Sequence, residues 1–566
     1  MKKFSELKFK RINIEDLAKK FNQLIEEFKD ASSFEEQNKA LKKINKFSED
    51  LETNITIGEV KYTLDTKDKT NQRNKQMLDE ITPLISSLFN RFNKELINAK
   101  FRKELEEEWG EYLFVMVQNS LDCFDEKIVP ELQELNKLSS EYTMLIASAQ
   151  IDFHGEICNL SQLSKHAQSK DREERREASL LSAKFFEENN EKIGEIYDKM
   201  VKVRTQMAKK LGYESFIELG YKSLGRTDYD KNMVKGYRDQ IYRDLVPFTN
   251  KLFKDQAKRI GIKNPQFYDY NLMFLSGNAQ PNGDKDFMVE QAQKMYHELS
   301  KETDEFFKFM REYELLDLET RPGKAGGGYM TYLPKYKAPF IFSNFNGTSG
   351  DVDVLTHEFG HAFQGYMSRN IKCPSYRSPT YEACEIHSMS MEFITYPWMD
   401  LFFGENEEKY RYAHLASAIT FIPYGVAVDE FQHWVYENPE VTHKDRCAKW
   451  REIEMKYLPH KKYDEAPILD EGGYWMRQSH IFGSPFYYID YTLAQVVAFQ
   501  FFIENEKNHD KAWKKYVKLC KLGGKYPFTQ LLEKAHLNNP FVDGTVKKVV
   551  KPLNKYLKSI DISKYQ

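Results

Sequence analysis

Apolar residues at helical spacing recur along most of the first 320 positions of the chain. Between Asn13 and Ala31, and again between Ile193 and Met207, they return every three or four residues. This period places the apolar side chains on one face of a helix. Asn13 is also a favourable N-cap residue for the first of these helices. The pattern therefore predicts a large, mainly α-helical protein.

The pattern changes after residue 320. Three consecutive glycines, Gly326 to Gly328, precede Tyr329, and the apolar run 339–346 is typical of a short strand. The order Gly-x-x-x-x-Gly-Lys-Ser/Thr of a phosphate-binding loop is absent, so no nucleotide site is predicted. We expect a mobile loop over a cleft, followed by a small β element. An ordinary flexible connector is the alternative.

Helical spacing resumes behind a break at residues 347–351 and carries a short motif, His357-Glu358-Phe-Gly-His361. Histidines four apart lie on one helix face, where both can bind one zinc ion, and Glu358 would lie beside a water molecule as a general base. With 13 His in 566 residues, this motif is expected by chance only about 0.03 times. A buried helix whose histidines make core hydrogen bonds is the alternative.

A catalytic zinc normally has three protein ligands. In the metzincin pattern the third is a His six residues after the second, but Met367 occupies that position, which excludes the subclass. Residues 381–392 form a second predicted helix, on which Glu385 and Glu392 share one face and His387 points about 200° away from Glu385. Cys384 faces yet another direction, which favours a structural role for it.

His-Glu-Phe-Gly-His, followed 24 residues later by Glu385 and then by Ser-Met-Ser-Met-Glu, resembles the thimet oligopeptidase and oligoendopeptidase F group of zinc peptidases. The resemblance implies that Glu385 is the third ligand of one Zn²⁺ per chain. Glu392 maps to an acidic position, for which we expect a hydrogen bond to a zinc histidine. The alternative for Glu382 and Glu392 is a solvated or ion-paired helix face.

A further match lies about a hundred residues downstream. A predicted loop carries His480 and leads into a helix with Tyr488 and Tyr491, whose spacing lets both hydroxyls point into the same space. The resemblance implies that His480 and Tyr491 donate hydrogen bonds to the oxyanion of the reaction, while Tyr488 helps to hold the peptide. Which tyrosine has which role stays open, and an aromatic core is the alternative.

The same resemblance assigns further residues to the substrate site. It places a strand edge near the glycine loop, where it would pair with the substrate backbone. On this basis the residues expected to bind substrate are Gly327, Gly328, Tyr329 and Tyr487.

The resemblance also implies the architecture and the activity. We expect a helical two-part shell that encloses a deep peptide channel, with a small β element beside the zinc-site helix. Residues 1–190 would form an N-terminal helical domain and residues 191–566 the catalytic domain. The expected activity is cleavage of internal bonds in short unfolded oligopeptides, with Glu358 activating the attacking water.

Two other functions fit the motif. A zinc carboxypeptidase would need a cation for the terminal carboxylate of its substrate, and Arg377 or Arg477 could supply it. A non-enzymatic peptide-binding protein with a structural zinc would need a fourth protein ligand, and the sequence near the motif offers no obvious fourth Cys or His.

Composition limits the partners and the cellular compartment that we expect. The 83 basic and 86 acidic residues give a net charge of −3, so we expect no nucleic-acid or membrane partner. The resemblance implies short peptides as the partners. The first residues carry no apolar stretch typical of a signal peptide, and no later run approaches a membrane span. Six scattered cysteines without a Cys-x-x-Cys pair suit free thiols. We therefore expect a cytoplasmic protein.

Overall fold

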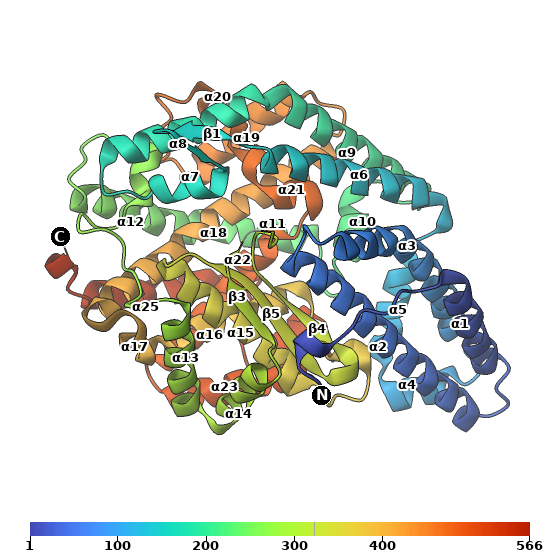
Figure 1. The fold of residues 1–566 in the computed structure, drawn as a ribbon. Helices are drawn as coiled ribbons and strands as arrows, with labels where there is room; N and C mark the ends of the chain where they lie inside the picture. The colour runs from blue at the N-terminus through green and yellow to red at the C-terminus, as the bar shows by residue number, and fades with distance from the viewer. Residues whose placement is uncertain (322, 566) are drawn as a thin grey trace.

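The protein is built mainly of α-helices (Figure 1), as its sequence predicts. The computed structural model describes residues 1–321 and 323–565. The first part of the chain contains α1 (Ile14–Lys29), α2 (Phe34–Leu64), α3 (Lys69–Ile97), α4 (Arg102–Trp109), α5 (Glu111–Asp122) and α6 (Val129–Ala147). A small hairpin follows, formed by β1 (Ile151–Phe153) and β2 (Glu156–Cys158).

The middle of the chain continues with α7 (Leu160–His166), α8 (Arg172–Glu188), α9 (Asn190–Lys210), α10 (Phe216–Ser223), α11 (Lys231–Gln240), α12 (Val246–Arg259), α13 (Lys285–Leu299) and α14 (Lys301–Glu312). Three strands follow, β3 (Leu316–Glu319), β4 (Tyr329–Leu333) and β5 (Ala338–Phe345).

The last part contains α15 (Ser349–Ser368), α16 (Tyr381–Ile394), α17 (Asp400–Phe403), α18 (Glu407–Glu437), α19 (His443–Tyr457), α20 (Pro467–Asp470), α21 (Ser479–Gly483), α22 (Tyr488–Asn505), α23 (His509–Leu522), α24 (Phe528–Lys534) and α25 (Thr545–Ser559). None of the helices within the described residues has the length and apolar character needed to cross a membrane.

The first predicted helix shows how local sequence sets these elements. Asn13 caps α1, because its side-chain oxygen accepts hydrogen bonds from the backbone N–H groups of Glu15 and Asp16. Phe21 and Phe28, on the predicted apolar face, are fully buried. The predicted boundary at residue 190 coincides with the start of α9 and stays a prediction.

The small β element lies beside the helix that carries the His-Glu motif, as expected. β5 is the central strand, paired in parallel with β3 and antiparallel with β4. The register places Tyr329 opposite Phe342 and Leu333 opposite Ala338. β5 is buried along almost its whole length because α15 packs against the sheet.

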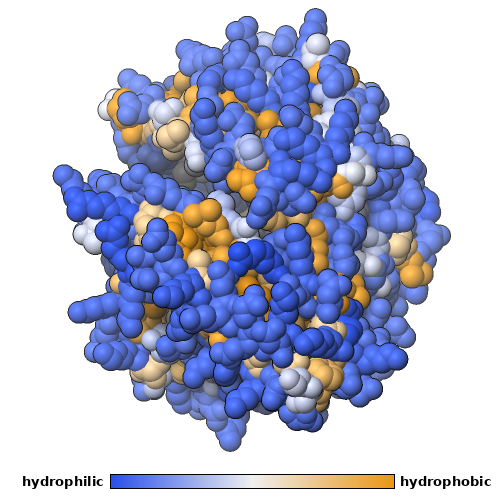
Figure 2. All heavy atoms as spheres, turned by 90° about the vertical axis from the view of Figure 1, so that its right-hand side faces the viewer, coloured by the Kyte–Doolittle hydropathy of each residue, from blue (hydrophilic) through white to orange (hydrophobic). Residues whose placement is uncertain are grey.

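The other helices surround the small sheet and α15 on several sides. In Figure 1, α1 to α5 form a group on the right, while α6 to α9 and α19 to α21 lie across the top. Figure 2 looks at the right-hand side of this view: the surface is mostly hydrophilic, and hydrophobic side chains gather beside a hollow in it.

The backbones of α15 and α16 approach closely at Gly360, inside the His-Glu motif. A Cβ atom at this position would lie 2.7 Å from the carbonyl oxygen of His387 and 2.8 Å from Cα of Ser388. Glycine is therefore required here for packing, since both contacts are with backbone atoms that cannot rotate away. This contact fixes the distance between the two helices that carry the predicted metal ligands.

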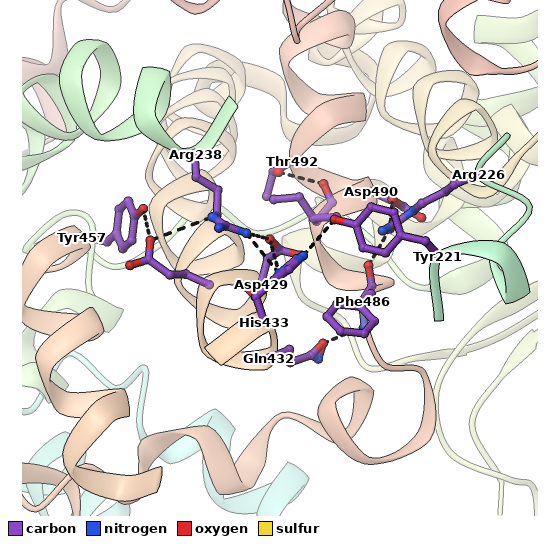
Figure 3. A network of polar contacts seen from close by, with 12 residues as sticks. Tyr221, Arg226, Arg238, Asp429, Gln432, His433, Tyr457, Phe486, Asp490 and Thr492 are labelled. Carbon is purple, nitrogen blue, oxygen red and sulfur yellow. Dashed lines mark hydrogen bonds and ion pairs between the residues drawn. The ribbon is translucent and has the colours of Figure 1, made fainter. Parts of the chain in front are cut away.

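The turn before α22 is held by two buried side chains (Figure 3). Phe486 has a positive φ of 67°, which is uncommon for a residue with a side chain. Its N–H donates to Gln432 Oε1 at 2.7 Å, and its carbonyl accepts from Arg226 at 2.6 Å. Arg226 also donates to Asp490 at 2.7 Å, and neither side chain is exposed. These contacts fix the direction in which α22 begins.

The same network continues into α18. Arg238 donates to Asp429 at 2.6 Å, and the Tyr221 hydroxyl lies 2.9 Å from Nε2 of His433 (Figure 3). Asp429 and His433 are four residues apart on α18, so both face the same neighbours. Buried charges that are paired in this way hold α10, α11, α18 and α22 in one arrangement.

Glu382 lies at the edge of this network and is fully buried. Both of its carboxylate oxygens lack a hydrogen-bond partner among the described residues. Burial and the charge of Asp490 raise the pKa of Glu382, against the opposing effect of Arg226. Asp490 has the hydrogen bond to Arg226, so Glu382 is the carboxyl group that keeps its proton at neutral pH. A solvated or ion-paired face is therefore wrong for Glu382.

Replacing Gly360 by alanine should destabilise the protein. The added methyl group would press against the backbone of α16, and overpacking of this kind costs about 1–3 kcal/mol. Urea unfolding measures the effect. Gly365→Ala is the matched control on the same helix, because its Cβ would meet only the Tyr332 ring at 3.4 Å. Equal stability of the two variants would contradict this account of the helix contact.

Glu382→Gln should flatten the decline of stability with rising pH. In the wild type the unfolded chain loses the Glu382 proton near pH 4.3, while the folded protein keeps it to higher pH, so the free energy of unfolding falls as pH rises. One such group contributes at most about 1.4 kcal/mol per pH unit. Urea unfolding between about pH 5 and pH 8 tests this.

The control for this experiment is Glu405→Gln, at an exposed position. It should keep the wild-type pH dependence of the unfolding free energy. A Glu382→Gln protein whose stability falls as steeply as that of the wild type would show that Glu382 is ionised in the folded state.

Candidate metal centre

The predicted ligands come together from two adjacent helices. His357 and His361 lie one turn apart on α15, with their ring centroids 4.9 Å apart. Oε2 of Glu385, on α16, lies 3.3 Å from Nε2 of His357 and 3.5 Å from Nε2 of His361. One potential ligand atom from each residue lies within 4.8 Å of the other two. Two imidazoles and one carboxylate are a donor set that fits catalytic zinc.

Glu385 is held in place by two hydroxyl groups. Tyr487 donates to its Oε1 at 2.7 Å, and Ser388 donates to its Oε2 at 3.0 Å. Burial alone would raise the pKa of Glu385, but the nearby His361 and His357 lower it well below its ordinary value. The carboxylate is therefore ionised, as a metal ligand must be.

Glu392 bridges two histidines behind this group. Its Oε1 lies 2.6 Å from Nδ1 of His357, and its Oε2 lies 2.7 Å from Nε2 of His414. His414 in turn contacts the Tyr396 hydroxyl through Nδ1 at 2.7 Å. A carboxylate on Nδ1 leaves Nε2 of His357 free to bind a metal. His414 lies on α18 and carries no local motif, so only the tertiary structure identifies it.

Glu358 follows His357 on α15 and is 9% exposed. Its Oε2 has no hydrogen-bond partner among the described residues, which is costly for a buried carboxylate unless a further group occupies the site. Burial raises the pKa of Glu358, although the two neighbouring histidines oppose this effect. A carboxylate with a raised pKa is better suited to accept a proton near neutral pH.

His480 and three tyrosines form a cluster beside Glu385, to which Tyr487 is hydrogen-bonded. The His480 ring centroid lies 5.9 Å from that of Tyr487, 5.0 Å from Tyr488 and 5.8 Å from Tyr491. The amide of Gln478 contacts Nδ1 of His480 at 2.7 Å, which leaves the Nε2–H available as a donor. Burial lowers the pKa of His480, so the ring is neutral. His480 lies on the short helix α21, where the sequence predicted only a loop.

The tyrosines differ in their contacts. The hydroxyl of Tyr487 donates to Glu385, so Tyr487 contacts a predicted metal ligand directly. From the sequence, we expected it only to bind substrate. Burial and the charge of Glu385 raise the pKa of Tyr491, whose hydroxyl therefore stays protonated and can donate. The ring centroids of Tyr487 and Tyr491 are 5.0 Å apart, and those of Tyr488 and Tyr491 are 5.6 Å apart.

The glycine loop is tied to its neighbours. Asn344 donates to the carbonyl oxygens of Ala325 and Gly327, both at 2.8 Å. The Tyr329 hydroxyl lies 2.6 Å from the Thr63 hydroxyl on α2. A Cβ on Gly328 would lie 3.7 Å from the Val354 side chain of α15, so the loop passes over the start of that helix. Substrate binding by Gly327, Gly328, Tyr329 and Tyr487 stays a prediction.

The two arginines considered for a carboxypeptidase differ in availability. Arg377 donates to Glu49 at 2.5 Å and to the carbonyl of Ile371, so its charge is already paired. Arg477 lies in the wall of a cavity, three residues before His480. A second group that could hold a metal, outside the predicted site, consists of Glu156, Cys158 and His166.

Comparison with known families identifies both parts of the chain. Residues 4–124 match the peptidase M3 N-terminal domain, and residues 165–550 match peptidase family M3. A search of curated proteins found no match.

Solved structures agree over the whole chain. PZ peptidase A in complex with an inhibitor shares 50% identity, with a TM-score of 0.95, and the match covers 99% of this chain and 100% of the other. A protein described as oligoendopeptidase F shares 49% identity, with a TM-score of 0.95 and 99% of each chain covered. Another protein so described, from Bacillus anthracis, shares 48% identity, with a TM-score of 0.91 and 100% and 99% covered.

The fold, the family matches and these near full-length similarities together show that the chain is a peptidase that belongs to peptidase family M3.

Proposed function

We propose that the protein is a zinc-dependent endopeptidase that cleaves internal bonds of short, unfolded peptides. The observation that carries this proposal is the convergence of His357, His361 and Glu385 beside the buried, unpartnered Glu358. Structural zinc sites are closed by four protein ligands, whereas catalytic sites have three. The three donors found here therefore favour catalysis over a structural metal.

A zinc ion held by His357, His361 and Glu385 would acidify a water molecule and polarise the scissile carbonyl group. Glu358 accepts the proton of this water as the water attacks the carbonyl carbon. It then delivers the proton to the nitrogen of the leaving amine. The raised pKa of Glu358 suits both transfers, because the group must bind the proton and release it within one cycle.

His480 and Tyr491 are the proposed donors to the oxyanion. His480 is neutral with its Nε2–H free, and Tyr491 stays protonated, so each presents a donor without adding a charge. One such donor is typically worth about 3 kcal/mol in the transition state. Tyr487 is the less suitable donor, since its hydroxyl is bound to Glu385. We assign it to positioning that ligand, and Tyr488 to holding the peptide.

The restriction to short peptides rests on the similar proteins described as oligoendopeptidases and on the expected channel between the two parts of the shell. The six cysteines are all free, which fits a reducing compartment, and we therefore propose the cytoplasm.

Glu358→Gln should abolish cleavage while leaving the metal bound. The substitution removes the proton acceptor but none of the three ligands, so kcat should fall by several orders of magnitude. The measurement is cleavage of an internally quenched peptide of about ten residues with both ends blocked, with the zinc content of both proteins matched.

Blocked ends also separate the two classes of peptidase. An endopeptidase cuts this peptide internally, whereas a carboxypeptidase needs a free terminal carboxylate. Failure of the zinc-loaded wild type to cut the blocked peptide, together with trimming of an unblocked one, would favour the carboxypeptidase.

A further inference from the structure

A second group of potential metal ligands lies on the β1–β2 hairpin and on α7, the helix that follows it (Figure 1). One ligand atom from each of Glu156, Cys158 and His166 lies within 4.8 Å of the other two. Glu156 and Cys158 are two residues apart on β2, so their side chains leave the same face of the hairpin. His166 ends α7, which packs against both strands. Local structure therefore brings the three side chains together.

His166 is oriented in the way that metal-binding histidines usually are. Its Nδ1 lies 2.7 Å from Oε1 of Glu174, on α8, and its ring centroid lies 4.5 Å from that of Phe153. The Ser169 hydroxyl donates to the other oxygen of Glu174 at 2.5 Å, which fixes this carboxylate. A carboxylate on one ring nitrogen of a histidine sets the tautomer and leaves the other nitrogen for a metal. Nε2 of His166 is therefore the available donor.

Cys158 supplies a sulfur donor in apolar surroundings. It is 1% exposed and belongs to a small cluster with Phe153, Leu163 and Ala178, separate from the main core. In the described part of the chain its thiol forms no hydrogen bond. The protein has six free cysteines, but this is the one that lies within a group of three potential metal ligands among the described residues. A metal ion binds the thiolate, so the thiol proton would pass to solvent on binding.

The carboxylates next to this group are already engaged. Glu174 is held by His166, and Oε2 of Glu177 lies 2.8 Å from Nε2 of His154, in the turn of the hairpin. Among the described residues, no buried carboxylate without a partner lies beside the group, in contrast to Glu358 beside the predicted zinc ligands. A metal ion here would lack a general base for activating water. The surroundings therefore favour binding of a cation without hydrolysis.

We propose that Glu156, Cys158 and His166 bind a second, exchangeable divalent cation that prefers sulfur and nitrogen ligands, such as Zn²⁺. Donors around a tetrahedral zinc ion lie about 3.5 Å apart, and the exposed Glu156 side chain is free to close the remaining distance. Three protein ligands leave one position to water, so the ion can exchange with solvent. A thiolate disfavours Mg²⁺ and Ca²⁺, which take oxygen ligands.

The bound cation would fasten the hairpin to α7. Leu163 of α7 belongs to the apolar cluster of Cys158 and also lines a cavity of about 630 Å³, to whose wall α8 contributes Ser179 and Phe186. The hairpin thus covers the outer side of this wall, and the cation would link the two layers. This second site goes beyond the proposed peptidase function and does not depend on it.

Titration of the metal-free protein with Co²⁺, with its cysteines kept reduced, tests the site. A thiolate bound to Co²⁺ gives a charge-transfer band in the near ultraviolet, which a site of two histidines and one glutamate cannot give. The wild type should bind one Co²⁺ without this band and a second one with it. Cys158→Ser replaces only the sulfur atom and should abolish both the band and the binding of the second ion.

Cys373→Ser is the matched control, because Cys373 is also buried and belongs to neither group of potential ligands. It should keep the band and both ions. The urea unfolding midpoints of the metal-free Cys158→Ser protein and the metal-free wild type should agree, which excludes misfolding as the cause of the loss. His166→Gln is the second variant for the same purpose: it keeps the sulfur but should weaken binding of the second ion at least 10-fold, roughly the effect of losing a supporting contact.

Glu174→Gln tests the orientation of His166. The affinity for the second ion should fall about 10- to 100-fold, while the band at saturation remains because all three ligands are still present. Glu177→Gln is the matched control on α8, since Glu177 contacts His154 and none of the proposed ligands. It should leave the affinity unchanged. Equal affinities of these two variants would contradict the positioning role of Glu174.

Three results would overturn the second site. They are a wild type saturated with Co²⁺ that shows no charge-transfer band, a band that survives Cys158→Ser, and a band that is lost in Cys373→Ser. None of these results depends on peptide cleavage or on the ion bound without a thiolate. Their failure would therefore leave the proposed peptidase function standing, whereas absence of cleavage by the wild type would count against that function alone.

Discussion

The close contact between α15 and α16 is the constraint on which the proposed site depends. Two of the proposed ligands come from α15 and one from α16, and ligand atoms must lie about 2.0–2.3 Å from a zinc ion. The helices can meet this requirement only because Gly360 lets their backbones touch at His387 and Ser388. Residue 360 lies between the two histidines, so the motif determines the ligands and also the separation of the helices.

A second layer of contacts holds each proposed functional side chain in a defined orientation. Glu392 fixes His357, Tyr487 fixes Glu385, and Gln478 fixes His480. The turn that begins α22 is in turn held by Gln432 and Arg226. These contacts orient the functional groups before substrate binds, so little reorganisation is required during the reaction. Glu358 is the exception, since its Oε2 has no partner within the described part of the protein.

Local sequence patterns were sufficient to predict the two helices that carry the proposed ligands. Helical spacing and the break at residues 347–351 located α15, and the same reasoning located α16 and the face shared by Glu385 and Glu392. The contact of His414 with Glu392 was not predictable, because it joins parts of the chain that only the tertiary structure brings together. The hydrogen bond from Tyr487 to Glu385 was missed for the same reason. The burial of Glu382 was not predicted, because it depends on α22, which packs along α16.

Anomalous X-ray diffraction at the zinc absorption edge, from crystals grown with zinc, tests the central claim most directly. The account predicts a peak about 2.0–2.3 Å from Nε2 of His357, Nε2 of His361 and the Glu385 carboxylate, without a fourth protein ligand. The absence of a peak between these residues would contradict the account. So would a peak closed by a fourth side chain, which would indicate a structural metal.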